Sequence, residues 1–122
     1  MILGVGVDMA TVPRFERLLE RFGARFVEKV MTPDEMRRWP DADARRLAKL
    51  FSAKEAVVKA LGSGFREGVT LQTVSIEQTS LGAPVVSLSG AAGERLDRLG
   101  ASQILVSISD EEDTVIAFAV AQ

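Results

Sequence analysis

One long helix, expected from about Asp43 to Leu61, constrains the fold of this chain more than any other feature. Its apolar residues recur at helical spacing and predict one buried face, made by Leu47, Leu50, Phe51, Val58 and Leu61. The turn Gly62-Ser63-Gly64 then ends the helix. A chain of 122 residues has room for one domain, which we place at residues 1–122, and the remaining elements must pack against this helix.

Strands are expected on both sides of the long helix in the sequence. An apolar run over residues 2–7 predicts a buried strand that ends at Asp8. The other β-rich runs form two expected pairs, residues 70–77 with 84–89 and residues 103–109 with 114–121, the second pair joined by an acidic turn at 110–113.

Three further helices complete the expected order. The first follows Thr11 as its cap and ends at Gly23, which leaves a short segment around residues 26–30. The second begins at Thr32-Pro33-Asp34-Glu35, a capping box, and the third spans residues 91–99. The order β-α-α-α-β-β-α-β-β predicts an α+β fold, a single small domain with a largely antiparallel sheet packed against the long helix.

Composition excludes several kinds of chemistry. The chain has no Cys and no His, which excludes disulfides, Cys/His zinc sites and histidine-based triads. Catalysis would therefore use carboxylates, Lys, Ser or Thr, backbone amides or a hard metal ion. A net charge of −2 argues against a nucleic-acid partner. The apolar N-terminus has no basic leader and is too short for a membrane span, so we expect a cytoplasmic protein with no membrane partner.

Asp8 is the first candidate functional residue. The preceding Gly4-Val5-Gly6 lacks the third glycine of a dinucleotide-binding motif, so we interpret these glycines as sites of close backbone approach. Two interpretations of Asp8 remain open, a carboxylate at a turn or a ligand of Mg²⁺.

Glu55 and Lys59 lie one helical turn apart on the long helix and share one face. They form either a solvated ion pair or a carboxylate for a metal beside an ammonium for phosphate. The glycine turn at 62–64 follows directly, and its amides can approach an anion. Together with Asp8, this second interpretation suits phosphoryl-type transfer.

A basic stripe, formed by Arg14, Arg17 and Arg21, runs along the first helix, and Arg25 and Lys29 extend it. This stripe is either a solvated helix face or a surface that docks an acidic protein, because a basic patch steers association with a negatively charged partner.

In combination, these motifs resemble the holo-acyl-carrier-protein synthases, the small bacterial class of 4′-phosphopantetheinyl transferases. The resemblance covers nearly the whole chain. It rests on residues 4–8, Arg14, Phe26 through Thr32 to Glu35, the helix segment 51–56, residues 59–64, Gly82-Ala83-Pro84 and Val106-Ser107-Ile108-Ser109.

The resemblance implies a 4′-phosphopantetheinyl transferase-like fold and transfer of 4′-phosphopantetheine from coenzyme A to a serine of apo acyl carrier protein, with release of 3′,5′-ADP. It implies that Asp8 and Glu55 hold Mg²⁺ and are catalytic together with Lys59. By the same resemblance, coenzyme A is bound by Lys54, Lys59, Gly62, Ser63 and Gly64. The carrier protein is bound by Arg14, with Arg17, Arg21 and Lys29 as looser candidates. A homotrimer is also implied.

The sequence departs from the family pattern at three positions. Leu50 replaces an Arg, and Leu105 and Asp110 stand where the family usually has His. Arg45, Arg46 or Lys49 could supply replacement charge, and Glu35, Asp110 or a metal-bound water could accept the proton. Two alternatives follow from the sequence: a non-catalytic relative that binds carrier protein or acts as an assembly partner, or an unrelated small α+β ligand-binding domain, in which residues 2–7 would lie far from the long helix.

Overall fold

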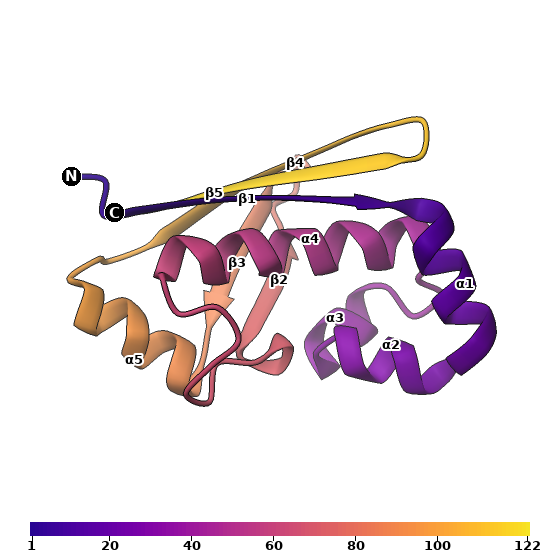
Figure 1. The fold of residues 1–122 in the computed structure, drawn as a ribbon, viewed down its shortest axis with the longest axis horizontal. Helices are drawn as coiled ribbons and strands as arrows, with labels where there is room; N and C mark the ends of the chain where they lie inside the picture. The colour runs from indigo at the N-terminus through magenta and orange to yellow at the C-terminus, as the bar shows by residue number, and fades with distance from the viewer.

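Helix α4 (Ala44–Leu61) lies at the centre of the molecule in a computed structural model that describes residues 1–122 (Figure 1). The remaining elements are β1 (Gly4–Thr11), α1 (Val12–Phe22), α2 (Ala24–Val30), α3 (Pro33–Arg38), the 3₁₀ helix η1 (Leu71–Thr73), β2 (Val74–Gln78), β3 (Pro84–Leu88), α5 (Gly90–Leu99), β4 (Ile104–Glu111) and β5 (Thr114–Ala121). The predicted long helix is confirmed. The predicted element order is wrong at one place, because the short segment around residues 26–30 belongs to a fourth helix, α2, that the order omits.

The strands form two separate antiparallel sheets that both contact α4. A three-stranded sheet has the order β1-β5-β4, and β2 pairs with β3 in a separate hairpin. Figure 1 shows the larger sheet along one side of α4, the hairpin crossing α4 and reaching β4, α5 near one end of α4 and α1 to α3 at the other end. The structure is therefore an α+β domain with antiparallel strands, as predicted, although the strands do not join into one sheet.

The strand expected over residues 70–77 begins only at Val74, because residues 71–73 form the 3₁₀ helix η1. Two other predicted strand boundaries are wrong for one shared reason. Strand β1 does not end at Asp8 but continues to Thr11, because every residue from Gly4 to Thr11 pairs with a residue of β5. Likewise β4 runs to Glu111, and only Glu112 and Asp113 form the turn, where Glu112 has a φ of 52°. Cross-strand pairing overrides the low intrinsic β-propensity of these acidic residues.

Strand β1 contacts α4 so closely that two glycines are required. A Cβ on Gly4 would overlap the carbonyl oxygen of Ala60, and one on Gly6 would overlap the carbonyl oxygen of Ala56. This confirms the interpretation of the glycines as sites of close backbone approach. It also contradicts the arrangement required by an unrelated domain, because the N-terminal strand lies directly against the long helix.

The outer face of the larger sheet, which points away from α4, is apolar and uncovered. Its exposed side chains are Val5, Val7 and Met9 of β1, Leu105 of β4, and Ile116 and Phe118 of β5. Neighbouring strands bring these residues into one surface, since Val7 pairs with Phe118 and Met9 with Ile116.

None of the helices combines the length and the apolar composition that a bilayer crossing demands.

Candidate active site

Asp8, Glu55 and Lys59 come together where β1 runs alongside the C-terminal half of α4. Alternation along β1 turns Asp8 toward the helix, and its side chain is only 18% exposed. The ammonium of Lys59 donates a hydrogen bond of 2.9 Å to the carbonyl of Val7 and lies 3.4 Å from Oδ1 of Asp8. The close approach at Gly6 therefore brings the strand carboxylate beside the polar face of the helix.

Glu55 is half-buried beside Asp8, and its pKa is raised above its ordinary value. Burial is the main cause and the charge of Asp8 the next, while Lys59 and Arg14 oppose the shift. A carboxylate held against a second carboxylate gains from a cation placed between them. No third acidic, His or Cys side chain joins them, so an ion bound here would take its other ligands from water or a substrate.

The turn at residues 62–64 follows α4, as predicted, but two of its amides are already used. The amide of Gly62 donates to Lys59 and that of Gly64 to Val58, both of them carbonyls of the helix end. Gly62 and Gly64 adopt φ of 75° and 60°, which glycine tolerates. The turn therefore supplies shape and the Ser63 hydroxyl, not the glycine amides that we expected to approach an anion.

Arg95 of α5 completes this corner and was not singled out from the sequence. Its Nε donates a 2.9 Å hydrogen bond to the carbonyl of Leu61, the last residue of α4. Its guanidinium also lies beside Gly62. The partial negative charge at a helix C-terminus disfavours an anion, and Arg95 and Lys59 offset it.

Lys54, which the resemblance assigns to coenzyme A binding, lies in the core of the protein. Its side chain is fully buried, and its ammonium donates to Oε1 of Glu35 at 2.6 Å, to the carbonyl of Val30 at 2.7 Å and to that of Leu71 at 2.9 Å. All three donors are thus used inside the protein. Burial lowers the pKa of Lys54, and the Glu35 carboxylate opposes this shift.

Glu35 is equally committed and cannot act as the proton acceptor considered above. Its carboxylate accepts from Lys54 and from the amides of Thr32 and Ile76. The Thr32–Glu35 capping box is confirmed, but the same carboxylate also joins α3 to β2 and α4. Sequence spacing predicts the capping box between Thr32 and Glu35, but it does not predict the bonds of Glu35 with Lys54 and Ile76, which are distant in sequence.

The three positions that depart from the family pattern have separate structural roles. Leu50 is buried in the core and Leu105 lies on the outer face of the sheet. Asp110 forms ion pairs with Arg45 at 2.8 Å and Lys49 at 3.1 Å, which lower its pKa, the hydrogen bond from Lys49 most of all. Arg45 and Lys49 are therefore occupied by Asp110, and this carboxylate is a poor proton acceptor.

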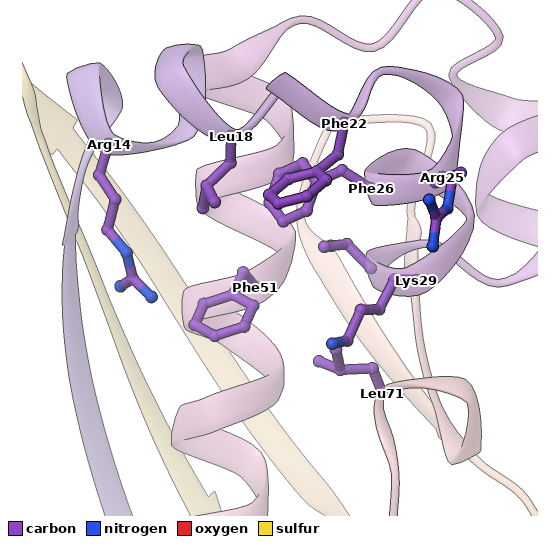
Figure 2. Close-up of a pocket in the computed structure, with 9 residues that line it drawn as sticks. Arg14, Leu18, Phe22, Arg25, Phe26, Lys29, Phe51 and Leu71 are labelled. Atoms are coloured by element: carbon purple, nitrogen blue, oxygen red, sulfur yellow. The ribbon is translucent and has the colours of Figure 1, made fainter. Parts of the chain in front are cut away.

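A groove of about 390 Å³ lies between α1, α2 and α4. Figure 2 shows Phe22, Phe26 and Phe51 along it, with the cationic side chains of Arg14, Arg25 and Lys29 around it. Of the residues predicted to bind a partner, Arg14 and Lys29 thus line the groove, whereas Arg17 and Arg21 are exposed on α1 outside its lining. Arg14 joins the groove to the carboxylate pair, because its charge acts on Glu55.

Part of the apolar lining of this groove comes from α1. Leu18 and Phe22 follow Val12 and Phe15 at helical spacing, yet both line the groove, and Phe22 is 43% exposed. Only Val12 and Phe15 of this helix are buried. The apolar residues of α1 continue past the part of this helix that packs in the core. That excess length of apolar sequence is the signal that indicates an open apolar surface.

Comparison with known proteins agrees with this arrangement. The family model described as 4'-phosphopantetheinyl transferase superfamily matches residues 4–119. The holo-[acyl-carrier-protein] synthase of Neisseria meningitidis serogroup A is 42% identical, covering 100% of this chain and 99% of its own. A crystal structure of the synthase from Neisseria meningitidis superposes with a TM-score of 0.93 at 40% identity, covering 100% of this chain and 99% of that one. The Helicobacter pylori synthase, solved in complex with coenzyme A, gives a TM-score of 0.85 at 28% identity over 97% of this chain and 99% of that chain.

Fold and site thus define the class: the chain is an enzyme of the 4′-phosphopantetheinyl transferase superfamily. The full-length identity narrows this further. The chain belongs to the holo-[acyl-carrier-protein] synthases, which confirms the resemblance identified from the sequence.

Proposed function

We propose that this chain transfers 4′-phosphopantetheine from coenzyme A to a serine of an apo acyl carrier protein, with Mg²⁺, and releases 3′,5′-ADP. The observation that carries the proposal is the convergence of Asp8, Glu55 and Lys59 from two elements, beside a basic groove. The relative from Helicobacter pylori, crystallised with coenzyme A, supports the choice of donor. In the reaction the serine oxygen bonds to the phosphorus that carries pantetheine, the bond from that phosphorus to the oxygen of the 3′,5′-ADP group breaks, and the serine proton passes to water.

Each residue of the site has a proposed role. Asp8 and Glu55 would hold Mg²⁺, since two carboxylates together with substrate phosphates are a common magnesium site. When bound, the ion would neutralise negative charge on the diphosphate of coenzyme A. Lys59 is 50% exposed, so its ammonium can turn from the Val7 carbonyl toward a phosphate. Gly62, Ser63 and Gly64 would line the coenzyme A cleft.

A transfer assay tests this function. Purified protein with Mg²⁺, coenzyme A and a panel of apo carrier proteins should add the mass of one phosphopantetheine group to a carrier and release 3′,5′-ADP. If no carrier is modified, the proposal fails. Calorimetry would then identify a non-catalytic relative by binding of a carrier protein without binding of coenzyme A.

The groove is the proposed docking site for the carrier protein. Its cationic rim suits an acidic partner and its apolar floor suits the nonpolar side chains of a helix. Arg17 and Arg21, exposed on the same helix, would add to the attraction over a longer range.

We expect Lys29→Ala to raise the KM for carrier protein about tenfold, the effect of losing one charge contact worth about 1.4 kcal/mol. The KM for coenzyme A should not change, and added salt should narrow the difference from the unmodified chain. Arg37→Ala is the matched control, because Arg37 is an exposed cation of α3 outside the groove. An equal effect of both substitutions would contradict a specific docking site.

The outer face of the β1-β5-β4 sheet supports the proposal of a homotrimer. Its exposed residues, including Val7, Met9 and Phe118, form an apolar surface of the kind that subunit contacts cover. Light scattering should give three times the chain mass, and Phe118→Glu should lower it, because a buried carboxylate would be left without a partner. A monomer at micromolar concentration would contradict the trimer.

A further inference from the structure

The C-terminal end of α2 is held by two side chains that come from elsewhere in the chain. The amide nitrogen Nε2 of Gln72 donates to the carbonyls of Glu28 at 2.9 Å and Met31 at 3.0 Å. From the buried side, Lys54 donates to the carbonyl of Val30 at 2.7 Å. The last carbonyls of a helix lack partners within it, so these two side chains act as its cap.

The same two side chains tie α2 to η1. Gln72 belongs to η1, and Lys54 donates to the carbonyl of Leu71, which is its neighbour in that element. Glu35 neutralises Lys54 and fixes its position in the core. Gln72 and Lys54, which we call the α2 clamp, therefore set the separation between the end of α2 and η1.

This separation sets the shape of the groove. Lys29 and Val30 line it from α2, Leu71 from η1, and Phe51 from the turn of α4 that precedes Lys54. Without the clamp, the free carbonyls could still bind water, but nothing else holds α2 at this distance from η1 through a side-chain hydrogen bond. The clamp thus governs where the cation of Lys29 stands relative to the aromatic floor.

We propose that Gln72 and Lys54 are positioning residues for the carrier protein: they touch neither substrate but hold one wall of the docking groove in place. This inference rests on the proposed function, since it takes the groove as the docking site. It also assigns Lys54 a role in partner binding in place of the cofactor contact expected from the sequence.

Gln72→Met is the sharpest test, because it keeps the length of the side chain, removes both donors and adds no charge. Gln72 is exposed but caps α2, so the substitution should lower the unfolding temperature by only a few degrees, and binding is measured well below that temperature. We expect the Kd for carrier protein, measured by calorimetry, and its KM to rise about three- to tenfold, while kcat and the KM for coenzyme A stay the same. Gln103→Met, the same change at an exposed glutamine just before β4 and outside the groove, is the control and should alter none of these values.

Lys54→Met should have a larger effect of the same kind if the variant folds, and the conclusion does not depend on it. If Gln72→Met leaves the Kd for carrier protein unchanged and transfer still occurs, the positioning role of the α2 clamp is overturned, whereas the proposed function stands. A rise in the KM for coenzyme A equal to that for carrier protein overturns it as well, because a general loosening of the fold would explain both. If the protein without substitutions neither binds any carrier protein nor transfers phosphopantetheine to one, both the role of the α2 clamp and the proposed function are overturned.

Discussion

Glu55→Gln and Asp8→Asn should each lower kcat for phosphopantetheine transfer by about 10²–10³-fold, the usual effect of removing a group that stabilises charge in a transition state. Both substitutions keep the side-chain shape and remove one negative charge from the pair that faces the proposed ion. Asn and Gln keep the side-chain volume and one weak oxygen ligand. The substitutions should therefore lower kcat while the protein still folds. Measurement of kcat at saturating coenzyme A and carrier protein checks this result.

The effect on stability should have the opposite sign. The pKa of Glu55 is raised by burial and by Asp8, so at neutral pH its ionised form is less favourable in the folded chain than in the unfolded chain. Replacing it with a neutral Gln removes this penalty at neutral pH, and the unfolding temperature should not fall. Below the ordinary pKa of a glutamate, where the carboxyl is protonated in both states, the difference should disappear.

Loss of activity with retained or increased stability is therefore the expected signature of a functional carboxylate. Glu77→Gln, at an exposed carboxylate of β2, is the matched control and should leave transfer and stability close to those of the unmodified chain. Near-normal turnover in Glu55→Gln would remove this residue from the metal site, and a fall in unfolding temperature would contradict its electrostatic assignment.

The sequence predicts the parts of this site that depend on local pattern. Helical spacing places Glu55 and Lys59 on one face, and the paired glycines before Asp8 indicate a strand that approaches other backbone closely. The contact between the strand at Asp8 and the helix at Glu55 and Lys59 is a tertiary contact, which local sequence patterns do not show. The carboxylate pair could therefore be proposed only by resemblance until the packing of β1 on α4 was known.

Lys54 shows where such reasoning fails. Helical spacing places Lys54 on the face of Leu50 and Val58 that is predicted to be buried, but spacing does not show which groups would pair with a charge there. Its burial depends on Glu35 and on the carbonyls of Val30 and Leu71, which come from three other elements. The partners of Gln72 are equally distant in sequence, which is why a polar residue in a predicted strand gave no indication of the α2 clamp.

Gly6→Ala should damage both the fold and the site. The added methyl group would overlap the carbonyl oxygen of Ala56 and lie 2.8 Å from the Cβ of Lys59, and neither the helix backbone nor that Cβ can yield without moving α4. Overpacking of this kind lowers the free energy of unfolding by about 1–3 kcal/mol, and backbone overlap places this site at the upper end. Because Asp8 follows two residues later, any movement of β1 away from α4 also separates Asp8 from Glu55.

Transfer activity should consequently fall at least tenfold even at temperatures where Gly6→Ala remains folded, as judged by circular dichroism. Gly93→Ala gives a control in which the same substitution has the opposite effect. Gly93 lies within α5, its added methyl would meet nothing closer than 3.9 Å, and alanine favours a helix over glycine by about 1 kcal/mol. A chain that loses stability at both glycines, or at neither, would contradict the close packing of β1 on α4 that brings the two carboxylates together.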